Sequence, residues 1–568
     1  MDDFKPFDFQ EVIDEFKDSF NEKAVADRPK KVLPKILYSL LATAVISAII
    51  YYFTFPALNF HAKEFYYFLI AIVAVFMTCF YVACGATKRY GRREYVKQQS
   101  KYPLIIVGVI AVIMLVGSIA GATLFRARSY NKLMTVQSAD FSKDFEEIKF
   151  SEVPRLDKDS TKALADNKLN ELSEYVSQFM VSENSYQINY KGRPVRVIPL
   201  EYGDFFKWVN NVKSGLPAYM IVDMVKQDVT VVELEQGMRY SPTELFNRKL
   251  ERHLRFQFPT AIFDQSNFEI DENGNPYWIT AVLQKKIGLF GGDDVKGAVI
   301  TNAVTGESTY YDVKDVPNWV DRVYNDELII NQYNYYGKFQ RGFINSVIGQ
   351  KDVTVTSLGN GYIALNDDVW LYTGVTSATS DASNVGFILC NQRTKETRYY
   401  QIGGATETGA MTSAEGAVQD FGYKASFPIL LNVSGEPTYF MPLKGSDNTV
   451  KKYAMVSFKQ RTIFGIGDTV EQCAEAYEKS LVQNGVVQQE KPPVVQSKSV
   501  TGQIEELRTA VKNGNTVCYI KVGGKFYSID VNSCEQAIIM NVGDKVVVEY
   551  SGDDSKAIIP ASKVDFAK

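Results

Sequence analysis

Three long apolar runs occupy much of the first 125 residues and constrain the fold more than any other feature. They extend over residues 36–55, 65–85 and 104–125, and none contains Lys, Arg, Asp or Glu. About 20 residues of α-helix cross a hydrocarbon layer roughly 30 Å thick. Soluble core helices would keep a polar face, and a signal peptide would begin earlier in the chain. We therefore expect residues 36–125 to form a three-helix transmembrane region that contacts the lipid bilayer.

Positive charges beside the apolar runs predict their orientation, because Lys and Arg concentrate in cytoplasmic loops. The segment before the first run and the loop between the second and third runs carry most of them: Lys23, Arg28, Lys30, Lys31, Lys35, Lys88, Arg89, Arg92, Arg93, Lys97 and Lys101. Arg126, Arg128 and Lys132 after the third run are a counter-signal. The pattern predicts a cytoplasmic N-terminus and an extracytoplasmic location for residues from about 126 onward.

Composition narrows the compartment and the partners. The 6 cysteines form no C-x-x-C pair or regular framework, which favours neither a zinc site nor a disulfide scaffold. An outer domain without disulfides is typical of a Gram-positive cell surface rather than of an oxidising compartment. The net charge of −4 gives no nucleic-acid signature. We expect a bacterial cell-envelope protein.

Domain boundaries follow from changes in pattern along the chain. The fold class that we predict is α+β and membrane-anchored, ending in a small β-barrel of OB or SH3 type. The predicted parts are a cytoplasmic tail with an acidic amphipathic helix (1–35), the membrane region (36–125), a stalk and a helix over about 160–181 (126–184), a repeated α+β region (185–485), a linker (486–499) and the barrel (500–568).

Internal repetition predicts β-hairpins in the region 185–485. Residues 297–311 align without gaps with residues 386–400, at an offset of 89, and each copy reads as strand, polar turn and Tyr-rich strand. We expect a helix after each copy, near 317–330 and 407–420. Gly-x-Pro leads into a strand at Gly192, Gly274 and Gly435, because glycine takes the positive φ of a turn. A last helix is expected over 470–483.

The hairpin turn carries a family resemblance. With Thr305-Gly306-Glu307 at its turn, the strand–hairpin–helix unit resembles the PepSY domain family. In the second copy the glycine is replaced, giving Thr394-Lys395-Glu396. The resemblance implies a helix packed on a small antiparallel sheet, and an extracytoplasmic binding or protease-modulating module.

Two groups of residues are candidates for partner binding. Tyr310, Tyr311, Tyr399 and Tyr400 lie on the hairpins, and tyrosine is favoured at interfaces, although strand alternation places one of each pair on the packed face. Arg248, Arg252 and Arg255 form a basic cluster on a helix expected over 242–256. We interpret that cluster as a solvated face paired with Glu244 and Glu251; contact with an anionic wall polymer, headgroups or a partner is the alternative.

No catalytic motif emerges from the sequence. The 2 histidines have no motif around them, and we expect no cofactor, no metal and no enzymatic activity. The predicted function is a non-catalytic scaffold or binding protein for an envelope protein or wall polymer, with homo-oligomerisation through the membrane helices left open. A sensor that passes outer ligand binding to the N-terminal helix is the alternative. An envelope hydrolase using acidic pairs such as Asp293/Asp294 or Asp367/Asp368 is the third.

Overall fold

The structure is a computed structural model that describes residues 26–147, 149–365, 367–487, 498–512, 515–531, 534–550 and 557–567. The acidic helix expected within residues 1–35 and most of the expected linker lie outside the described residues. The chain divides into two compact units, Met1–Leu481 and Val482–Lys568.

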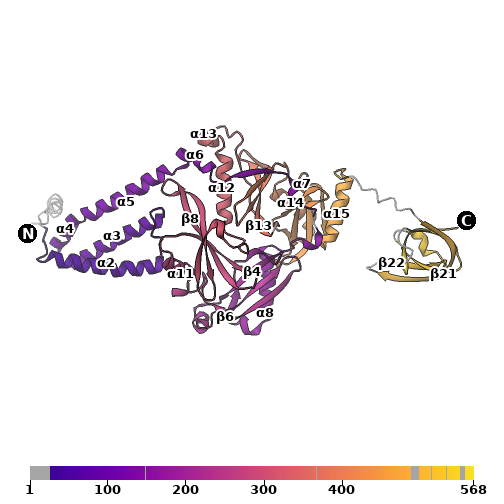
Figure 1. The fold of residues 1–568 in the computed structure, drawn as a ribbon, viewed down its shortest axis with the longest axis horizontal. Coiled ribbons are helices and arrows are strands. Elements are labelled where there is room, and N and C mark those ends of the chain that lie inside the picture. Colours follow the sequence, from indigo (N-terminus) through magenta and orange to yellow (C-terminus); the bar gives the residue numbers. More distant parts are fainter. Residues whose placement is uncertain are drawn as a thin grey trace, which may run out of the picture. The chain divides into compact units, whose positions relative to one another are not determined.

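Three apolar helices begin the larger unit, as the sequence predicts (Figure 1). They are long and apolar enough to cross a membrane. Their bounds are α2 (Val32–Thr54), α3 (Lys63–Ala83) and α5 (Lys101–Ala120), with the basic helix α4 (Tyr90–Gln99) leading into α5. The second loop, expected only as a charged connection, is thus largely helical.

Four sheets follow in the same unit. The first sheet contains β2 (Phe179–Val181), β3 (Tyr186–Tyr190), β4 (Arg193–Tyr202), β5 (Leu216–Asp223) and β6 (Asp228–Met238). The second contains β7 (Ile262–Ile270), β8 (Pro276–Ile287), β9 (Gly291–Asn302) and β10 (Ser308–Asp312). The third contains β1 (Val136–Ala139), β11 (Thr354–Thr356), β12 (Gly361–Leu365), β13 (Asp368–Ser377), β14 (Ser380–Asn391) and β15 (Thr397–Tyr400). The fourth contains β16 (Lys424–Ala425), β17 (Ile429–Val433), β18 (Glu436–Lys444), β19 (Val450–Ser457) and β20 (Phe464–Gly467).

The predicted hairpins are present. The two aligned segments form the antiparallel pairs β9–β10 and β14–β15. Their turns share a left-handed residue, Gly306 at φ +79° and Lys395 at φ +64°. The three Gly-x-Pro segments introduce β4, β8 and β18, each pairing with the strand before it. The two predicted hairpins and the three strands predicted after Gly-x-Pro are therefore confirmed.

Helices outside the membrane region are shorter than, or displaced from, those predicted. The helix expected over 160–181 ends at Asn170 and is followed by the short α9 (Ser173–Val176) and by β2. The helix expected over 242–256 begins at Leu250. The helices are α8 (Lys158–Asn170), α10 (Phe205–Asn211), α11 (Leu250–Gln257), α12 (Asp326–Lys338), α13 (Gly342–Val347), α14 (Glu407–Ala417) and α15 (Val470–Gln483). The last two match their predicted positions closely, whereas α12 begins nine residues after the predicted start of 317.

The predicted stalk is not a stalk. Its residues form α6 (Thr123–Asn131), then β1, which pairs in parallel with β15 at the edge of the third sheet, and then α7 (Phe141–Asp144). Phe141 and Phe145 are buried in the core between the third and fourth sheets. The segment therefore belongs to the folded body, because its aromatic side chains fill that core.

Consecutive sheets share their cores, because their central strands are apolar on both faces. In β8, Trp278 and Val282 pack toward the first sheet, whereas Ile279 and Ala281 pack toward the third. In β13, Leu371 and Val375 belong to that same core between the second and third sheets, and Trp370 and Tyr372 to the core shared with the fourth. The sheets are thus layers of one body rather than separate repeats.

The smaller unit is a closed five-stranded barrel, as predicted. Its strands are β21 (Lys498–Lys512), β22 (Asn515–Val522), β23 (Lys525–Asp530), β24 (Lys545–Tyr550) and β25 (Ile558–Phe566). β21 pairs with both β22 and β24, and β23 pairs in parallel with β25. The strand order around the barrel is β21-β22-β23-β25-β24. Between β23 and β24, Glu535–Ile538 form a 3-10 turn.

Candidate functional site

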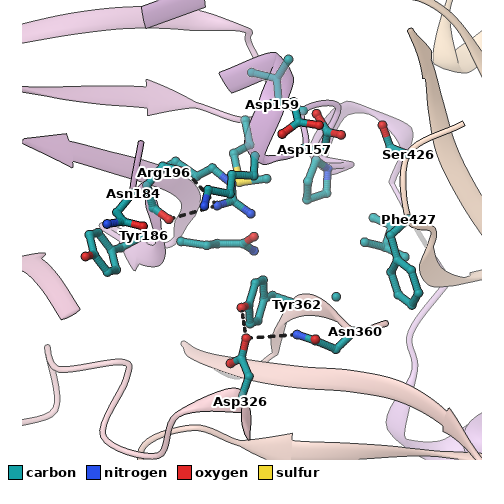
Figure 2. A pocket seen from close by; sticks show the side chains of 18 of the residues that line it. Asp157, Asp159, Asn184, Tyr186, Arg196, Asp326, Asn360, Tyr362, Ser426 and Phe427 are labelled. Carbon is teal, nitrogen blue, oxygen red and sulfur yellow. Dashed lines mark hydrogen bonds between the residues drawn. The ribbon is translucent and has the colours of Figure 1, made fainter. Parts of the chain in front are cut away.

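A polar cavity of about 670 Å³ lies where residues from all four sheets of the larger unit meet. Figure 2 shows its walls: Arg196 and Tyr186 on one side, Ser426 and Phe427 opposite, and Asp326 with Tyr362 below. The first sheet supplies β3 and β4, the second β7, the third β12, and the fourth β16 to β18. A volume of this size accommodates a small molecule or the end of a short peptide.

The cavity exists because the fourth sheet reaches back to the first. Lys444 at the end of β18 pairs with Asp157 at 2.5 Å and with Asp159 at 3.0 Å. Asp157 is also the N-cap of α8, accepting the Ser160 backbone N–H at 2.8 Å. Burial alone would raise the pKa of Asp157. Hydrogen bonds from Lys444 and Ser160 have a larger, opposite effect, so the net pKa is below the ordinary value. This ion-paired contact joins the first and last layers.

Arg196 is a buried cation in the wall. It lies on β4 between apolar neighbours and is only 7% exposed. Its Nη1 donates to the Ser185 carbonyl at 3.3 Å and to Ser185 Oγ at 3.1 Å, and its Nε has no acceptor. Among the described residues, no carboxylate lies within ion-pair distance of it. Burial, which disfavours the charged form, lowers the pKa of this guanidinium.

Arg322 is equally buried, but it has a partner. Its Nη2 lies 3.0 Å from Asp326 Oδ1 and donates to the Tyr362 hydroxyl at 3.1 Å. Asp326 also accepts from Asn360 at 3.1 Å and from Gln392 at 2.7 Å. The carboxylate is therefore fully hydrogen-bonded, and this side of the wall is held rigidly around the start of α12.

Further polar groups in the wall lack partners in the part of the chain that the structure describes. The Ser426 hydroxyl is buried without a hydrogen bond. The Gln187 side chain, on β3, is 3% exposed, and no hydrogen bond of its amide or of the Tyr186 hydroxyl occurs among those residues. Buried polar groups are normally hydrogen-bonded, so several unmet groups around one cavity are typical of a binding site.

The predicted arginine cluster has another role. Arg252 and Arg255 are buried, and their Nε atoms donate to the Tyr52 carbonyl at 2.7 Å and to the Phe55 carbonyl at 2.9 Å. These carbonyls end α2, where cations are favourable. Arg248 instead donates to the Val212 carbonyl. The interpretation as a solvated face is therefore wrong, because α11 packs against the end of the first apolar helix.

A second contact joins the apolar helices to the body. The turn between β8 and β9 carries Leu289 and Phe290, which lie against α5 and α3. A Cβ atom on Gly117 would lie 2.7 Å from Leu289 Cδ2, and one on Gly288 would lie 2.9 Å from Gly121 Cα. The glycine pair at positions 117 and 121 thus lets the hairpin tip approach the helix closely.

The four candidate tyrosines do not line the cavity. Tyr400 is buried in the core and donates to Asp144 at 2.9 Å. Tyr399 and Tyr311 pack on the core between the second and third sheets, whereas Tyr310 packs against the first core and donates to Asp312 at 3.0 Å. The tyrosines that suggested an interface therefore pack in or against the cores of the sheets.

The acidic pairs are engaged in ion pairs or hydrogen bonds. Asp294 is paired with Lys286 and Lys395, each at 2.5 Å, and Asp293 pairs with Lys285. Asp368 accepts two hydrogen bonds from Arg393, at 2.8 and 2.9 Å, and Asp367 accepts from Asn189 at 2.8 Å. Within the described ranges, no group of His, Cys, Asp or Glu could hold a metal ion.

The comparison with known proteins found no relative: no protein-family model matches the chain, and no curated protein matches it. The cavity residues were missed from the sequence because they come from segments more than 280 residues apart. One signal was present, namely Arg196 within the otherwise apolar run Pro194–Leu200. A single charge inside a strand buried on both faces indicates a polar site.

Proposed function

We propose that this protein is a membrane-anchored extracytoplasmic binding protein of a bacterial cell envelope, whose ligand occupies the cavity between the four sheets. The observation that carries the proposal is the presence in the cavity wall of buried polar atoms without a hydrogen bond in the described chain: Arg196 Nε, Arg322 Nε and Ser426 Oγ. The ligand enters the space where the first and fourth sheets meet. The body then acts as a receptor or scaffold and not as a catalyst.

Anchoring is supported by the inverted burial pattern of the apolar helices. In α2 the buried residues are Ser39, Thr43 and Ser47, whereas Leu37 and Leu41 are 58% and 65% exposed. Soluble helices bury their large apolar side chains and expose polar ones. Helices in lipid place small and hydroxylated residues at helix contacts and large apolar ones toward the hydrocarbon. A bilayer around α2, α3 and α5 would remove this apolar surface from water.

The orientation is supported by the basic helix α4 and its flanks. In Figure 1, α4 lies at the end of the bundle away from α11. This helix contains Arg92 and Arg93 and follows Lys88 and Arg89, and the positive-inside rule favours a cytoplasmic location for such a cluster. Protease added to intact protoplasts should therefore remove the sheets and barrel and leave a fragment containing α2 to α5. If a tag at residue 568 remained intact until the cells were lysed, the extracytoplasmic proposal would be wrong.

A sensor is the second candidate, and one observation favours it. The body is attached to α2 through Arg252 and Arg255, and to α5 through Leu289 and Phe290, so a movement of the sheets would displace the helices. Deleting residues 1–25 distinguishes the candidates, because a scaffold should retain function whereas a sensor should lose its output. Co-purification of envelope partners with the wild-type and the shortened chain measures the scaffold function.

A further inference from the structure

We propose that the cavity binds a ligand through a single carboxylate, which pairs with the guanidinium of Arg196. The inference rests on the proposed function, because it names the ligand class of the same cavity.

The other two buried cations of the wall provide the comparison. Arg322 has Asp326 at 3.0 Å, and Lys444 has Asp157 at 2.5 Å. Arg196 is as deeply buried as both, at 7% exposure, yet no carboxylate of the described chain pairs with it. A buried charge without a counter-ion destabilises the fold. A ligand that supplies the missing negative charge would remove this cost.

The hydrogen-bonding geometry defines the open side of the guanidinium. Nη1 is used by Ser185, whereas Nε has no acceptor, and Nη2 has no hydrogen bond among the described residues. Two neighbouring N–H groups on one edge match the two oxygens of a carboxylate. Nε is shielded from solvent, so engaging a ligand through this edge requires a rotation of the Arg196 side chain.

The surrounding charge favours one negative charge over two. Lys444 is balanced by Asp157 and Asp159, and Arg322 by Asp326. Two further wall carboxylates, Asp264 and Glu327, have no ion pair in the described chain. Among the described residues of the wall, Arg196 is the buried cation without an ion pair, and the exposed Lys158 is the other cation without one. A phosphate dianion would meet repulsion from the two unpaired acids. A carboxylate carries the single charge that Arg196 can balance.

The rest of the wall fits a ligand with a polar and an apolar part. Gln187, Tyr186 and Ser426 present polar groups, whereas Phe427 and Met224 supply apolar surface. In Figure 2, Ser426 and Phe427 lie across the cavity from Arg196. A ligand held by its carboxylate at Arg196 would therefore direct its other end toward the fourth sheet.

The test uses the full chain in lipid nanodiscs and matched pairs of probes. Hippurate is compared with hippuramide, and N-acetyl-alanyl-alanine with its C-terminal amide, by saturation-transfer difference NMR. The acids should bind about tenfold or more tightly than the amides, because only a carboxylate pairs with the guanidinium. Inorganic phosphate is the third probe and should compete more weakly than the acids.

Variants locate the effect. Arg196→Gln should abolish the preference for acids, and Arg196→Lys, which keeps the charge without the planar edge, should reduce it. Arg193→Gln, on the same strand but with a side chain 60% exposed, is the matched control and should bind as wild type. Thermal melting checks that each variant folds; if Arg196→Gln does not fold, the Lys variant and the acid–amide contrast decide.

Three results would overturn the inference: equal binding of acids and amides, tighter binding of phosphate, or no saturation of any acid. A preference for acids that survives both Arg196 variants would also overturn it. Equal binding of acids and amides would leave the cavity as a binding site, and the protoplast experiment is independent of all these results. Failure of the carboxylate inference is therefore distinguishable from failure of the proposed function.

Discussion

At the scale of single residues, the body buries several ionisable groups. Glu269 on β7 is fully buried and accepts the backbone N–H groups of Asp321 at 2.8 Å and Arg322 at 2.9 Å. Asp321 is itself buried and accepts from the Asn189 backbone. Burial raises the pKa of Glu269 to about 7, and burial together with Glu269 raises the pKa of Asp321. These carboxyls organise the loop that leads to Arg322 and the cavity.

The raised pKa of Glu269 predicts a pH dependence of stability. The stabilising contribution is complete below the unfolded-state pKa, near 4.5, and is lost as pH rises through about 7, because the unfolded state ionises first. Glu269→Gln should therefore flatten the fall in melting temperature between these pH values. Part of the pH dependence should remain in this variant, because burial also raises the pKa of Asp321. Glu307→Gln, at an exposed turn, is the control; a Glu269→Gln profile identical to wild type would contradict the prediction.

The two hairpin turns have different residues at their left-handed position, Gly306 in one and Lys395 in the other. Gly306 is required because a Cβ atom there would lie 2.4 Å from the Tyr240 ring. Lys395 occupies the equivalent left-handed position at some backbone cost, and its ammonium pairs with buried Asp294 at 2.5 Å. Burial raises the pKa of Asp294, but the hydrogen bonds from Lys286 and Lys395 outweigh it, so the pKa is lowered. The lysine thus joins the second and third sheets.

The substitution Lys395→Gly tests the backbone strain and the ion pair together, because the two change the stability of the fold in opposite directions. Relief of the left-handed strain would stabilise the fold by about 1 kcal/mol, whereas loss of a partner of a buried carboxylate costs about 3 kcal/mol. We expect a net loss of stability near neutral pH, measured by denaturant unfolding. The loss should shrink as pH falls through the lowered pKa of Asp294, because the protonated carboxyl group no longer forms an ion pair with Lys395. A more stable variant at neutral pH would contradict the structural role of the ion pair.

At the scale of elements, the contact between the β8–β9 turn and α5 connects the body to the membrane helices. Leu289 and Phe290 occupy the space that side chains at Gly117 would fill, and Tyr130 donates to the Gly121 carbonyl at 2.7 Å. The β8–β9 turn is thus an attachment point between the body and α5. The resemblance of the hairpin units to PepSY domains stays a prediction.

Gly117→Leu should release the hairpin tip from α5 without unfolding the sheets. The expected result is faster hydrogen exchange over residues 287–292 in nanodiscs, with unchanged protection of β13 and β14, because the sheet cores are not touched. Gly108→Leu is a matched control on the same helix, since no atom lies within 4 Å of its added Cβ. Equal exchange in both variants would show that the contact does not hold the turn.

At the scale of the whole molecule, the larger unit is a set of layers and the barrel a separate unit. The core between the first and second sheets includes Phe268 and Trp278, and the core between the third and fourth includes Phe387 and Tyr439. No middle sheet could be removed without exposing two cores. The barrel has its own core around Ile520 and Val546, so its stability is expected to be independent.

Removal of Val482–Lys568 should leave the melting temperature of the larger unit within about 3 °C of wild type, because an independent domain contributes little to another's stability. Removal of β7 to β10 should abolish its cooperative unfolding, since both faces of that sheet are buried. Differential scanning calorimetry in detergent measures both. A large shift after removal of the barrel would contradict its independence.

Several features were predictable because they depend on neighbours along the chain. Helix length and hydropathy identified α2, α3 and α5, and turn residues such as Gly192 and Gly274 identified the strands that follow them, β4 and β8. The candidate site was not predictable, because its residues come from four sheets and their contacts depend on how these sheets pack in space. The tyrosines and arginines chosen from the sequence are mainly packed or hydrogen-bonded. Composition alone does not distinguish such roles from binding.

The sequence by itself determined the apolar helices, the hairpins and the terminal barrel, because hydrophobic period and turn chemistry act over a few residues. Only the tertiary structure decided that the sheets share cores, that the expected stalk is part of the body, and that Lys444 meets Asp157 across 287 positions. Those outcomes depend on which buried surfaces and charges match in space. Arg196 shows the difference, because its sequence position reveals a buried charge but not the missing counter-ion.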